Sequence, residues 1–165
     1  MMNEKCAEEA DDMERIASFQ VDHEKLRKGM YTARVDGDVV TYDIRMKLPN
    51  AGDYLPNGTM HSLEHLLASY MRNSPVGDKV VYVGPMGCRT GFYLLVRDSL
   101  EPRELIRLVQ ESLDFVADYK GPIPGNSRRE CGNYREHDLV GAQAVARDMC
   151  QVLRRWTVAD LAYDK

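Results

Sequence analysis

Within the segment 38–48, apolar and polar residues alternate strictly from Val40 to Leu48. Every second residue there is apolar, whereas Asp43 and Arg45 are among the polar residues between them. A period of two is typical of a strand with one buried face. Residues 30–36 predict a partner strand, and the Asp36-Gly37 pair that separates the two segments favours a hairpin turn.

Three later segments carry apolar residues at the spacing of amphipathic helices. The first covers 59–73, and the other two cover 101–119 and about 137–156. Thr59 is the candidate N-cap of the first helix, because a threonine hydroxyl can accept a hydrogen bond from an amide of the first turn.

Residues 79–83 and 91–97 predict two further strands, and the second of these is apolar on both faces. Such a strand is covered on both sides. Helices can cover one side, and a second copy of the chain can cover the other. The element order β-β-α-β-β-α-α therefore predicts an α+β fold, with a mostly antiparallel sheet, helices packed on one face and a homodimer across the other.

The composition excludes several classes of protein. The 165 residues include 22 Lys and Arg against 26 Asp and Glu, so the formal net charge is -4. This balance argues against nucleic acid and against an anionic membrane surface as the main partner. The chain has no run of about 18 apolar residues that would predict a transmembrane helix. It also has no apolar signal-peptide core near the N-terminus, so we expect a cytoplasmic protein.

Acidic residues dominate the first 15 positions, which contain few large apolar groups. We therefore expect residues 1–15 to be a mobile acidic lead. Residues 16–165 are expected to form a single domain that carries the metal-binding and catalytic chemistry.

The strongest chemical motif is His61-Ser-Leu-Glu64-His65, within the first predicted helix. Residues four apart lie on the same face of a helix, so His61 and His65 can point two imidazoles at one metal ion. Glu64 can place a carboxylate nearby as an acid or base. The order of the residues is that of inverzincin proteases. The same pattern also arises by chance, with two ordinary histidines on a helix.

A third metal ligand has to come from another part of the chain. Cys131 lies in a polar loop between two predicted helices, and its thiolate could complete a His-His-Cys site. Such a site leaves a fourth position open for water or substrate, as catalytic sites do. Glu136 and His137 are nearby competitors, and a loop cysteine can equally be incidental.

A second cysteine, Cys88, lies in a glycine-rich turn between two predicted strands. Arg89 is adjacent to it, and Arg45 could approach from the polar face of its strand. Guanidinium groups favour the thiolate form, so Cys88 could be an acid/base group or a nucleophile. Alternatively, the thiol only packs in a tight turn. Cys6 and Cys150 receive no role.

The motifs occur in the order found in one enzyme family, together with two shorter segments. The matching stretches are His61-Ser-Leu-Glu64-His65-Leu-Leu, Gly84-Pro-Met-Gly-Cys88-Arg-Thr-Gly-Phe-Tyr, Cys131-Gly-x4-His137-Asp-Leu, Ser18-Phe-Gln-Val-Asp-His23 and Tyr42-Asp-Ile-Arg45. Together they closely resemble the S-ribosylhomocysteine lyase (LuxS) family over about residues 16–156. Each motif alone is modest, but all of them in register are highly specific.

The resemblance implies a homodimeric metalloenzyme of the activated methyl cycle, with its active site at the dimer interface. Enzymes of this family cleave S-ribosylhomocysteine to homocysteine and 4,5-dihydroxy-2,3-pentanedione, the precursor of the quorum-sensing signal autoinducer-2. They bind one divalent metal ion per subunit, Fe(II) in the native enzyme, with Zn(II) or Co(II) as possible alternatives.

The same resemblance implies roles for individual residues. His61, His65 and Cys131 match the metal ligands, and Glu64 and Cys88 match the two acid/base residues. The positions that line the substrate site are matched by Ser18, His23, Arg45 and Arg72. These roles agree with the chemistry, because moving a carbonyl along a sugar calls for a Lewis acid and for two groups that transfer protons.

The chain departs from the family pattern at two positions before Cys88. Tyr82 stands where many members have an acidic residue, and Gly84 stands where they have serine. The acidic residue is expected to help hold the amino-acid end of the substrate, so another group has to make that contact here.

Two other functions are open at this point. An inverzincin-type protease would use a carboxylate such as Glu136 as its third ligand and would leave Cys131 idle. A non-catalytic metal or signalling module would have a closed site with four protein ligands.

Overall fold

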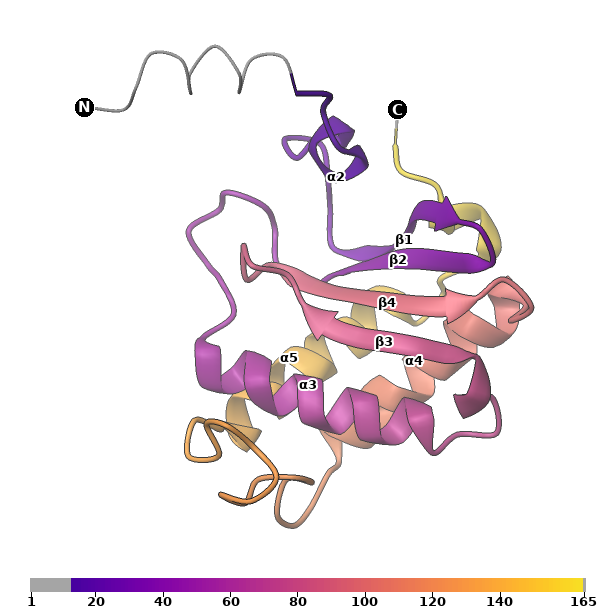
Figure 1. Cartoon of the computed structure of the whole chain (residues 1–165). Helices are drawn as coiled ribbons and strands as arrows, with labels where there is room; N and C mark the ends of the chain where they lie inside the picture. The colour runs from indigo at the N-terminus through magenta and orange to yellow at the C-terminus, as the bar shows by residue number, and fades with distance from the viewer. Residues whose placement is uncertain (1–12, 165) are drawn as a thin grey trace.

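One layer of the fold is a sheet made of β1 (Gly29–Asp36), β2 (Val39–Arg45), β3 (Val80–Pro85) and β4 (Gly91–Arg97). The computed structural model describes residues 13–164 of the chain. The strands pair antiparallel in the order β1-β2-β4-β3 (Figure 1). The predicted hairpin is confirmed, since β1 and β2 pair around Gly37, whose φ of 60° is in the left-handed region.

The other layer consists of the three long helices α3 (Asn57–Arg72), α4 (Pro102–Ala117) and α5 (Leu139–Leu153). They gather on one side of the sheet (Figure 1). Three short helical segments were not predicted, because they are too short to carry a periodic pattern. They are α2 (Ala17–Gln20), η1 (Gly77–Lys79) and η2 (Val158–Leu161).

The core lies between the two layers. Alternate residues of the central strands point toward the helices, so Ile44, Phe92 and Leu94 are almost wholly buried. They belong to one cluster with apolar helix residues such as Leu63 and Leu113. The period-two pattern of β2 therefore gives the sheet its apolar face, and the α+β class predicted from the sequence is confirmed.

Two helix starts differ from the prediction. The helix α3 begins at Asn57, after Pro56, so the prediction that Thr59 is its N-cap is wrong. The Thr59 side chain is buried and its hydroxyl donates to Asp138 Oδ2 at 3.1 Å. Asp138 is itself the N-cap of α5, because its Oδ1 accepts from the Gly141 amide at 2.9 Å. The helix α5 consequently starts later than predicted.

The chain after α5 returns to the sheet. The Trp156 Nε1 donates to the Met30 carbonyl at 2.9 Å, which takes this residue out of the helix that was predicted to reach it. Near the C-terminus, the Tyr163 ring stacks on that of Tyr31 with 5.0 Å between centroids. The segment after α5 thus lies against the first strand. The helix α2, before β1, contacts the same strand.

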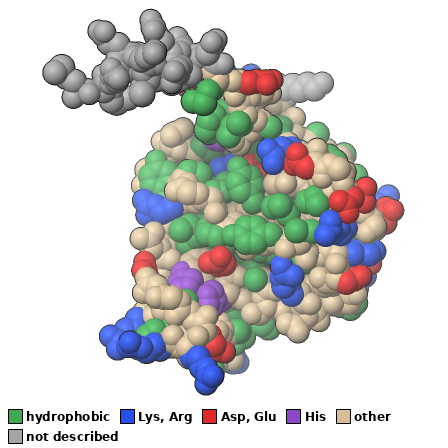
Figure 2. Space-filling model, in the orientation of Figure 1, with side chains coloured by type: hydrophobic (Ala, Val, Ile, Leu, Met, Phe, Trp, Pro, Cys, Tyr) green, Lys and Arg blue, Asp and Glu red, His purple; other side chains and the backbone are tan. Residues whose placement is uncertain are grey.

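Within residues 13–164, no long helix covers the opposite face of the sheet, which we call the open face. Tyr93 and Leu95 on this face are half-buried, and Tyr82 is 51% exposed. Hydrophobic side chains gather over these strands in Figure 2. The homodimer across the open face stays a prediction.

Two further predictions, on the acidic lead and on a membrane-spanning helix, can be compared with the described residues only. Residues 1–12 of the acidic lead, Cys6 among them, lie outside the described residues, and Met13, at its end, is exposed. In the part that is described, no helix has the length and apolar character needed to cross a membrane.

Candidate metal centre

His61 and His65 lie one turn apart on α3, with 4.6 Å between their ring centroids. Each ring is held by a backbone carbonyl. His61 Nδ1 donates to the oxygen of Glu136 at 2.8 Å, and His65 Nδ1 donates to the oxygen of Pro124 at 2.7 Å. A carbonyl oxygen only accepts, so each Nδ1 carries the hydrogen and each Nε2 keeps a free lone pair. Histidine ligands of metal ions are commonly oriented in this way.

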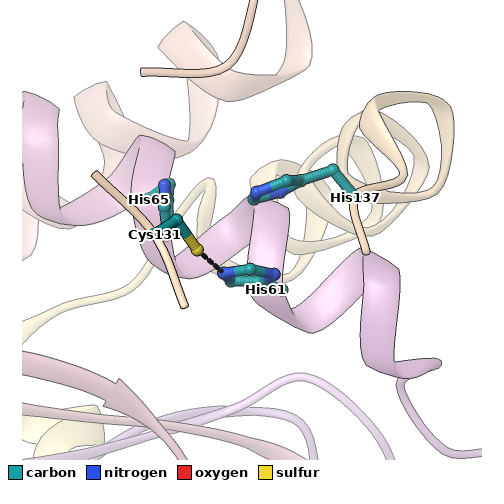
Figure 3. Close-up of side chains that lie close together, drawn as sticks. All are labelled: His61, His65, Cys131 and His137. Atoms are coloured by element: carbon teal, nitrogen blue, oxygen red, sulfur yellow. Dashed lines mark hydrogen bonds between the residues drawn. The ribbon is translucent and has the colours of Figure 1, made fainter. Parts of the chain in front are cut away.

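The loop between α4 and α5 supplies a sulfur atom to the same place. Gly125 has a φ of 70°, which turns the chain so that the Pro124 carbonyl meets His65. Further along, Cys131 Sγ lies 3.3 Å from His61 Nε2 and accepts from the Asn133 amide at 3.4 Å (Figure 3).

His137 lies against these residues. Its ring stacks on that of His61 with 4.0 Å between centroids, and its Nδ1 is 3.1 Å from Ser62 Oγ. Its Nε2 is buried and has no hydrogen-bond partner among the described residues. Burial, together with the neighbouring His61 and His65, lowers the pKa of His137, so its ring is neutral at pH 7.

Ligand atoms of the four residues all lie within 4.8 Å of one another; we call His61, His65, Cys131 and His137 the metal-ligating group. Imidazole nitrogens and a thiolate suit a divalent transition metal such as zinc or iron, so the group can hold one such ion. The sequence pattern favours His137 only as a competitor of Cys131, whereas the structure brings both to the site. Four protein ligands would also satisfy a closed structural site.

Glu136 does not supply a ligand to this group. Its backbone carbonyl accepts from His61, and its carboxylate accepts from the Asn133 side chain. The protease hypothesis requires a carboxylate in the place that Cys131 occupies here.

Glu64 faces a cleft of about 450 Å³ beside His65, which we call the metal cleft. The other residues that line it include Arg72, Tyr82, Pro124 and Gly125. The guanidinium of Arg72 donates to the Val81 carbonyl at 2.6 Å. The structure therefore brings Glu64 and Arg72 to the same cleft, next to the metal-ligating group.

The two positions that we expect to depart from the family pattern are in contact. Tyr82 and Gly84 lie on the same side of β3, and the Tyr82 ring covers Gly84, where an added Cβ atom would collide with the phenol. The ring can lie there only because position 84 has no side chain. Serine at this position would require Tyr82 to move.

Arg45 and Cys88 belong to a different part of the molecule. Arg45 is 3% exposed, and its Nη2 donates to Asp43 Oδ2 at 2.6 Å. Its Nη1 donates to Thr90 Oγ1 at 2.6 Å and approaches Cys88 Sγ to 3.9 Å. Burial opposes the charge of the guanidinium, but Asp43 outweighs it and raises the pKa of Arg45. A charged guanidinium therefore lies beside the Cys88 sulfur.

Arg45 also lines a cleft of about 240 Å³ on the open face, which we call the sheet-face pocket. Residues from the segment before β1, from three strands and from the C-terminus line it, among them Ser18, His23, Asp43, Tyr93 and Tyr163. The predicted site residues thus fall into two groups. Ser18, His23 and Arg45 line the sheet-face pocket with Cys88 beside it, whereas Glu64 and Arg72 accompany the metal-ligating group.

Asp43 and Tyr163 are among the pocket residues that received no role from the sequence. Asp43 could have been found, because opposite charges two residues apart on a strand lie on the same face. Tyr163 donates its hydroxyl hydrogen to Asp43 Oδ2 at 2.9 Å. Burial is the larger cause, and the charge of Asp43 the second, that raises the pKa of Tyr163. No local pattern links a C-terminal tyrosine to an aspartate on β2.

Cys150 differs from the other described cysteines. Its thiol donates to Asp114 Oδ1 at 3.2 Å, and burial together with Asp114 raises the pKa of Cys150 to about 12. The thiol therefore stays protonated and unreactive near neutral pH.

Comparison with known proteins identifies the family. A sequence model of LuxS, described as S-ribosylhomocysteinase, matches residues 16–159. The chain belongs to the LuxS family. All residues of the metal-ligating group lie inside the part that matches LuxS, and so do those of the sheet-face pocket except Tyr163.

Individual LuxS relatives cover most of the chain. The S-ribosylhomocysteine lyase of Phocaeicola vulgatus is 45% identical over 157 residues, which are 92% of this chain and 98% of the relative. That of Borreliella afzelii is 41% identical over 92% of this chain and 99% of the relative. That of Porphyromonas gingivalis is 46% identical over 81% of this chain and 87% of the relative.

Proposed function

We propose that this LuxS family member is an S-ribosylhomocysteine lyase that forms homocysteine and 4,5-dihydroxy-2,3-pentanedione, the precursor of autoinducer-2, by metal-assisted carbonyl migration and β-elimination. The observation that carries the proposal is the similarity to lyases of this name over nearly the whole chain, with the metal-ligating group at the motif positions. This carbon–sulfur lyase activity needs no redox cofactor, because an isomerisation followed by an elimination conserves electrons.

His61, His65 and Cys131 would hold one divalent metal ion per subunit, with Fe(II) as the native ion and Zn(II) or Co(II) as alternatives. The two histidines offer Nε2 lone pairs beside the cysteine sulfur. Soft thiolate and imidazole ligands suit all three ions. When bound, the ion supplies Lewis-acid stabilisation of negative charge on the sugar oxygens.

Glu64 and Cys88 would transfer the protons. The C–S bond breaks by β-elimination only when a carbonyl lies two carbons away, so the carbonyl has to migrate from C1 to C2 and then to C3 of the sugar. Each migration takes a proton from one carbon and returns one to its neighbour, which calls for two acid/base groups. The Glu64 carboxylate faces the metal cleft, and the Arg45 guanidinium lies 3.9 Å from the Cys88 sulfur. Homocysteine then leaves as its thiolate and takes up a proton.

A homodimer would bring these two groups together. In the described chain, Glu64 lines the metal cleft, whereas Cys88 lies beside the sheet-face pocket. Each active site would therefore join the metal cleft of one copy to the sheet-face pocket of the other, in a symmetric pair. The open face supports this arrangement, because its half-buried Tyr93 and Leu95 offer apolar surface to a partner.

The substrate would be held from both sides. Ser18, His23 and Arg45 would bind it from the sheet-face pocket, and Arg72 would bind its homocysteine end from the metal cleft. A guanidinium suits the carboxylate of that end. Tyr82 lines the same cleft in place of an acidic residue, and its ring face can attract the ammonium group.

The same chemistry favours the cytoplasm. Cys88 and Cys131 have to remain free thiols, which a reducing compartment ensures. Residues 16–165 would form the single catalytic domain of each subunit.

Release of free thiol from S-ribosylhomocysteine tests the proposal. Purified protein loaded with Fe(II) or Co(II) is expected to release homocysteine, and Glu64→Gln and Cys88→Ala are expected to lose about 10²–10⁴-fold in rate with their metal retained. Glu111→Gln and Cys150→Ala are matched controls with rates near that of the wild type. No release by the loaded wild type, or unchanged release by both site variants, would overturn the assignment.

A further inference from the structure

Three histidines meet at the metal centre, but their Nδ1 atoms have different partners. In His61 and His65 the partner is a backbone carbonyl, which only accepts. In His137 the partner is the hydroxyl of Ser62, at 3.1 Å. A hydroxyl can donate or accept. The hydrogen of Ser62 therefore decides which nitrogen of His137 carries a proton.

The surroundings of Ser62 settle the direction of this hydrogen bond. Ser62 is fully buried, and its oxygen already accepts from the Asp138 amide at 2.8 Å. A buried hydroxyl hydrogen needs an acceptor. Among the hydrogen-bond partners that the described chain gives Ser62, His137 Nδ1 is the one that can accept. Nδ1 therefore has no hydrogen, and the Nε2 of the neutral ring carries it.

We propose that His137 is not a fourth metal ligand but a hydrogen-bond donor to the position that His61, His65 and Cys131 leave open. A ring nitrogen that carries a hydrogen has no lone pair for a metal ion, whereas it donates readily to an anionic oxygen. Among the described residues the buried His137 Nε2 has no hydrogen-bond partner, and a ring nitrogen of His137 lies within 4.8 Å of the ligand atoms of His61, His65 and Cys131.

The acceptor that remains for this N–H group is a substrate oxygen. Cys131 Sγ already accepts from the Asn133 amide, so the thiolate has its own donor. A fixed N–H group aimed at an oxygen that gains negative charge stabilises the transition state. His137 would then be a catalytic residue, and Ser62 would be a positioning residue that fixes its tautomer.

This assignment also separates an open site from a closed one. With His137 as a donor, the protein supplies three ligands, as in catalytic sites, rather than the four of a structural site. The inference rests on the proposed metal site, but it does not require that the substrate be S-ribosylhomocysteine.

Imidazole NMR spectra of the zinc-loaded protein test the tautomers directly. The chain has only 4 histidines, and the signals of His137 are those lost in His137→Phe. His61 and His65 are expected to carry the proton on Nδ1 with a zinc-shifted Nε2. His137 is expected to carry it on Nε2, with and without zinc. A zinc-shifted Nε2 in His137 would overturn the proposal. Zinc content is measured separately, so failure of the metal site would show as absent zinc and not as a different tautomer.

Cobalt spectra of the same variant give a second test. His137→Phe is expected to retain Co(II) with the d–d bands of the wild type, because the ligand set is intact. Binding of azide, a small anion that takes the open position, is expected to weaken about tenfold or more when the N–H donor is lost. Loss of cobalt, a shift of its bands or unchanged azide affinity would each contradict the proposal. Ser62→Ala is expected to populate the Nδ1–H tautomer of His137. An unchanged His137 tautomer in this variant would show that Ser62 does not fix it.

Discussion

The metal-ligating group and the sheet-face pocket are built in different ways. The first takes two histidines from one turn of α3 and fixes each ring by a carbonyl of the loop between α4 and α5. The second is organised around a buried ion pair on β2, between Arg45 and Asp43, and is also lined by the segment before β1 and by Tyr163. We therefore expect the side chains of the first group to be replaceable without loss of the fold, whereas loss of the ion pair in the second is expected to destabilise the fold.

Removal of Cys131 is expected to have the largest effect on activity and a small effect on stability. Cys131→Ala takes away one of the proposed ligands, so the metal content after dialysis is expected to fall below about a tenth of that of the wild type, and thiol release to fall by about 10³-fold or more. Elemental analysis and the thiol assay measure both. Cys150→Ala is the control and is expected to retain metal. Full metal content in Cys131→Ala would show that Cys131 is not a ligand.

Removal of Arg45 is expected to have the largest effect on stability. Arg45→Met leaves the Asp43 carboxylate buried without its partner, which is expected to lower the free energy of unfolding by about 3–5 kcal/mol. Arg97→Met removes an exposed ion pair with Asp38 and is expected to cost about 0.5 kcal/mol. Urea denaturation measures both changes.

A second variant separates charge from packing in this comparison. Asp43→Asn in the Arg45→Met background removes the unpaired charge and is expected to regain part of the lost stability. Equal losses in Arg45→Met and Arg97→Met would show that the buried pair does not stabilise the fold.

The thiols are expected to differ in reactivity. Cys88 is exposed, whereas the raised pKa of Cys150, about 12, leaves its thiolate fraction near 10⁻⁴ at pH 8. Alkylation of Cys150 by iodoacetamide is therefore expected to be at least about a hundredfold slower than that of Cys88. Its rate should rise about tenfold per pH unit between pH 8 and 10, because the thiolate fraction grows until the pH reaches the pKa. Peptide mass spectrometry of the zinc-loaded protein measures both rates, and equal rates would contradict the burial of Cys150.

The smallest effect is expected from the coupled pair on β3. Gly84→Ala displaces the Tyr82 ring and is expected to lower the free energy of unfolding by about 0.5–1 kcal/mol. In a Tyr82→Ala background the same substitution is expected to be nearly neutral, since the ring is gone. Denaturation of the four proteins in this cycle measures the coupling. The same loss in both backgrounds would show that the two positions are independent.

Local patterns in the sequence predict the parts of the molecule that depend on spacing alone. The alternation around Ile44 predicts β2, and the spacing of His61 and His65 predicts two imidazoles on one face of a helix. Tertiary contacts decide the rest. Thr59 looks like an N-cap, yet its hydroxyl reaches Asp138, far along the chain.

The organisation of the candidate site also required the structure. The separation of Glu64 from Cys88 reflects the positions of a helix and of a turn in the sheet, which no motif reports. His137 shows the same limit, because the tautomer that we propose for it rests on its hydrogen bond with the buried hydroxyl of Ser62. Residue types and spacing identify candidates, whereas hydrogen-bond partners assign roles to them.

Complementation between two inactive variants tests most directly whether two copies share each active site. Cys131→Ala lacks a proposed metal ligand and Cys88→Ala lacks a proposed acid/base group, so each variant alone is expected to be inactive. In the proposed arrangement, the metal cleft of the Cys88→Ala copy in a mixed dimer would meet the intact Cys88 of the other copy. Random mixing is therefore expected to restore thiol release to about a quarter of that of the wild type, with one working site per mixed dimer. Activity no higher than the sum of the separate variants would show that each active site lies within a single chain.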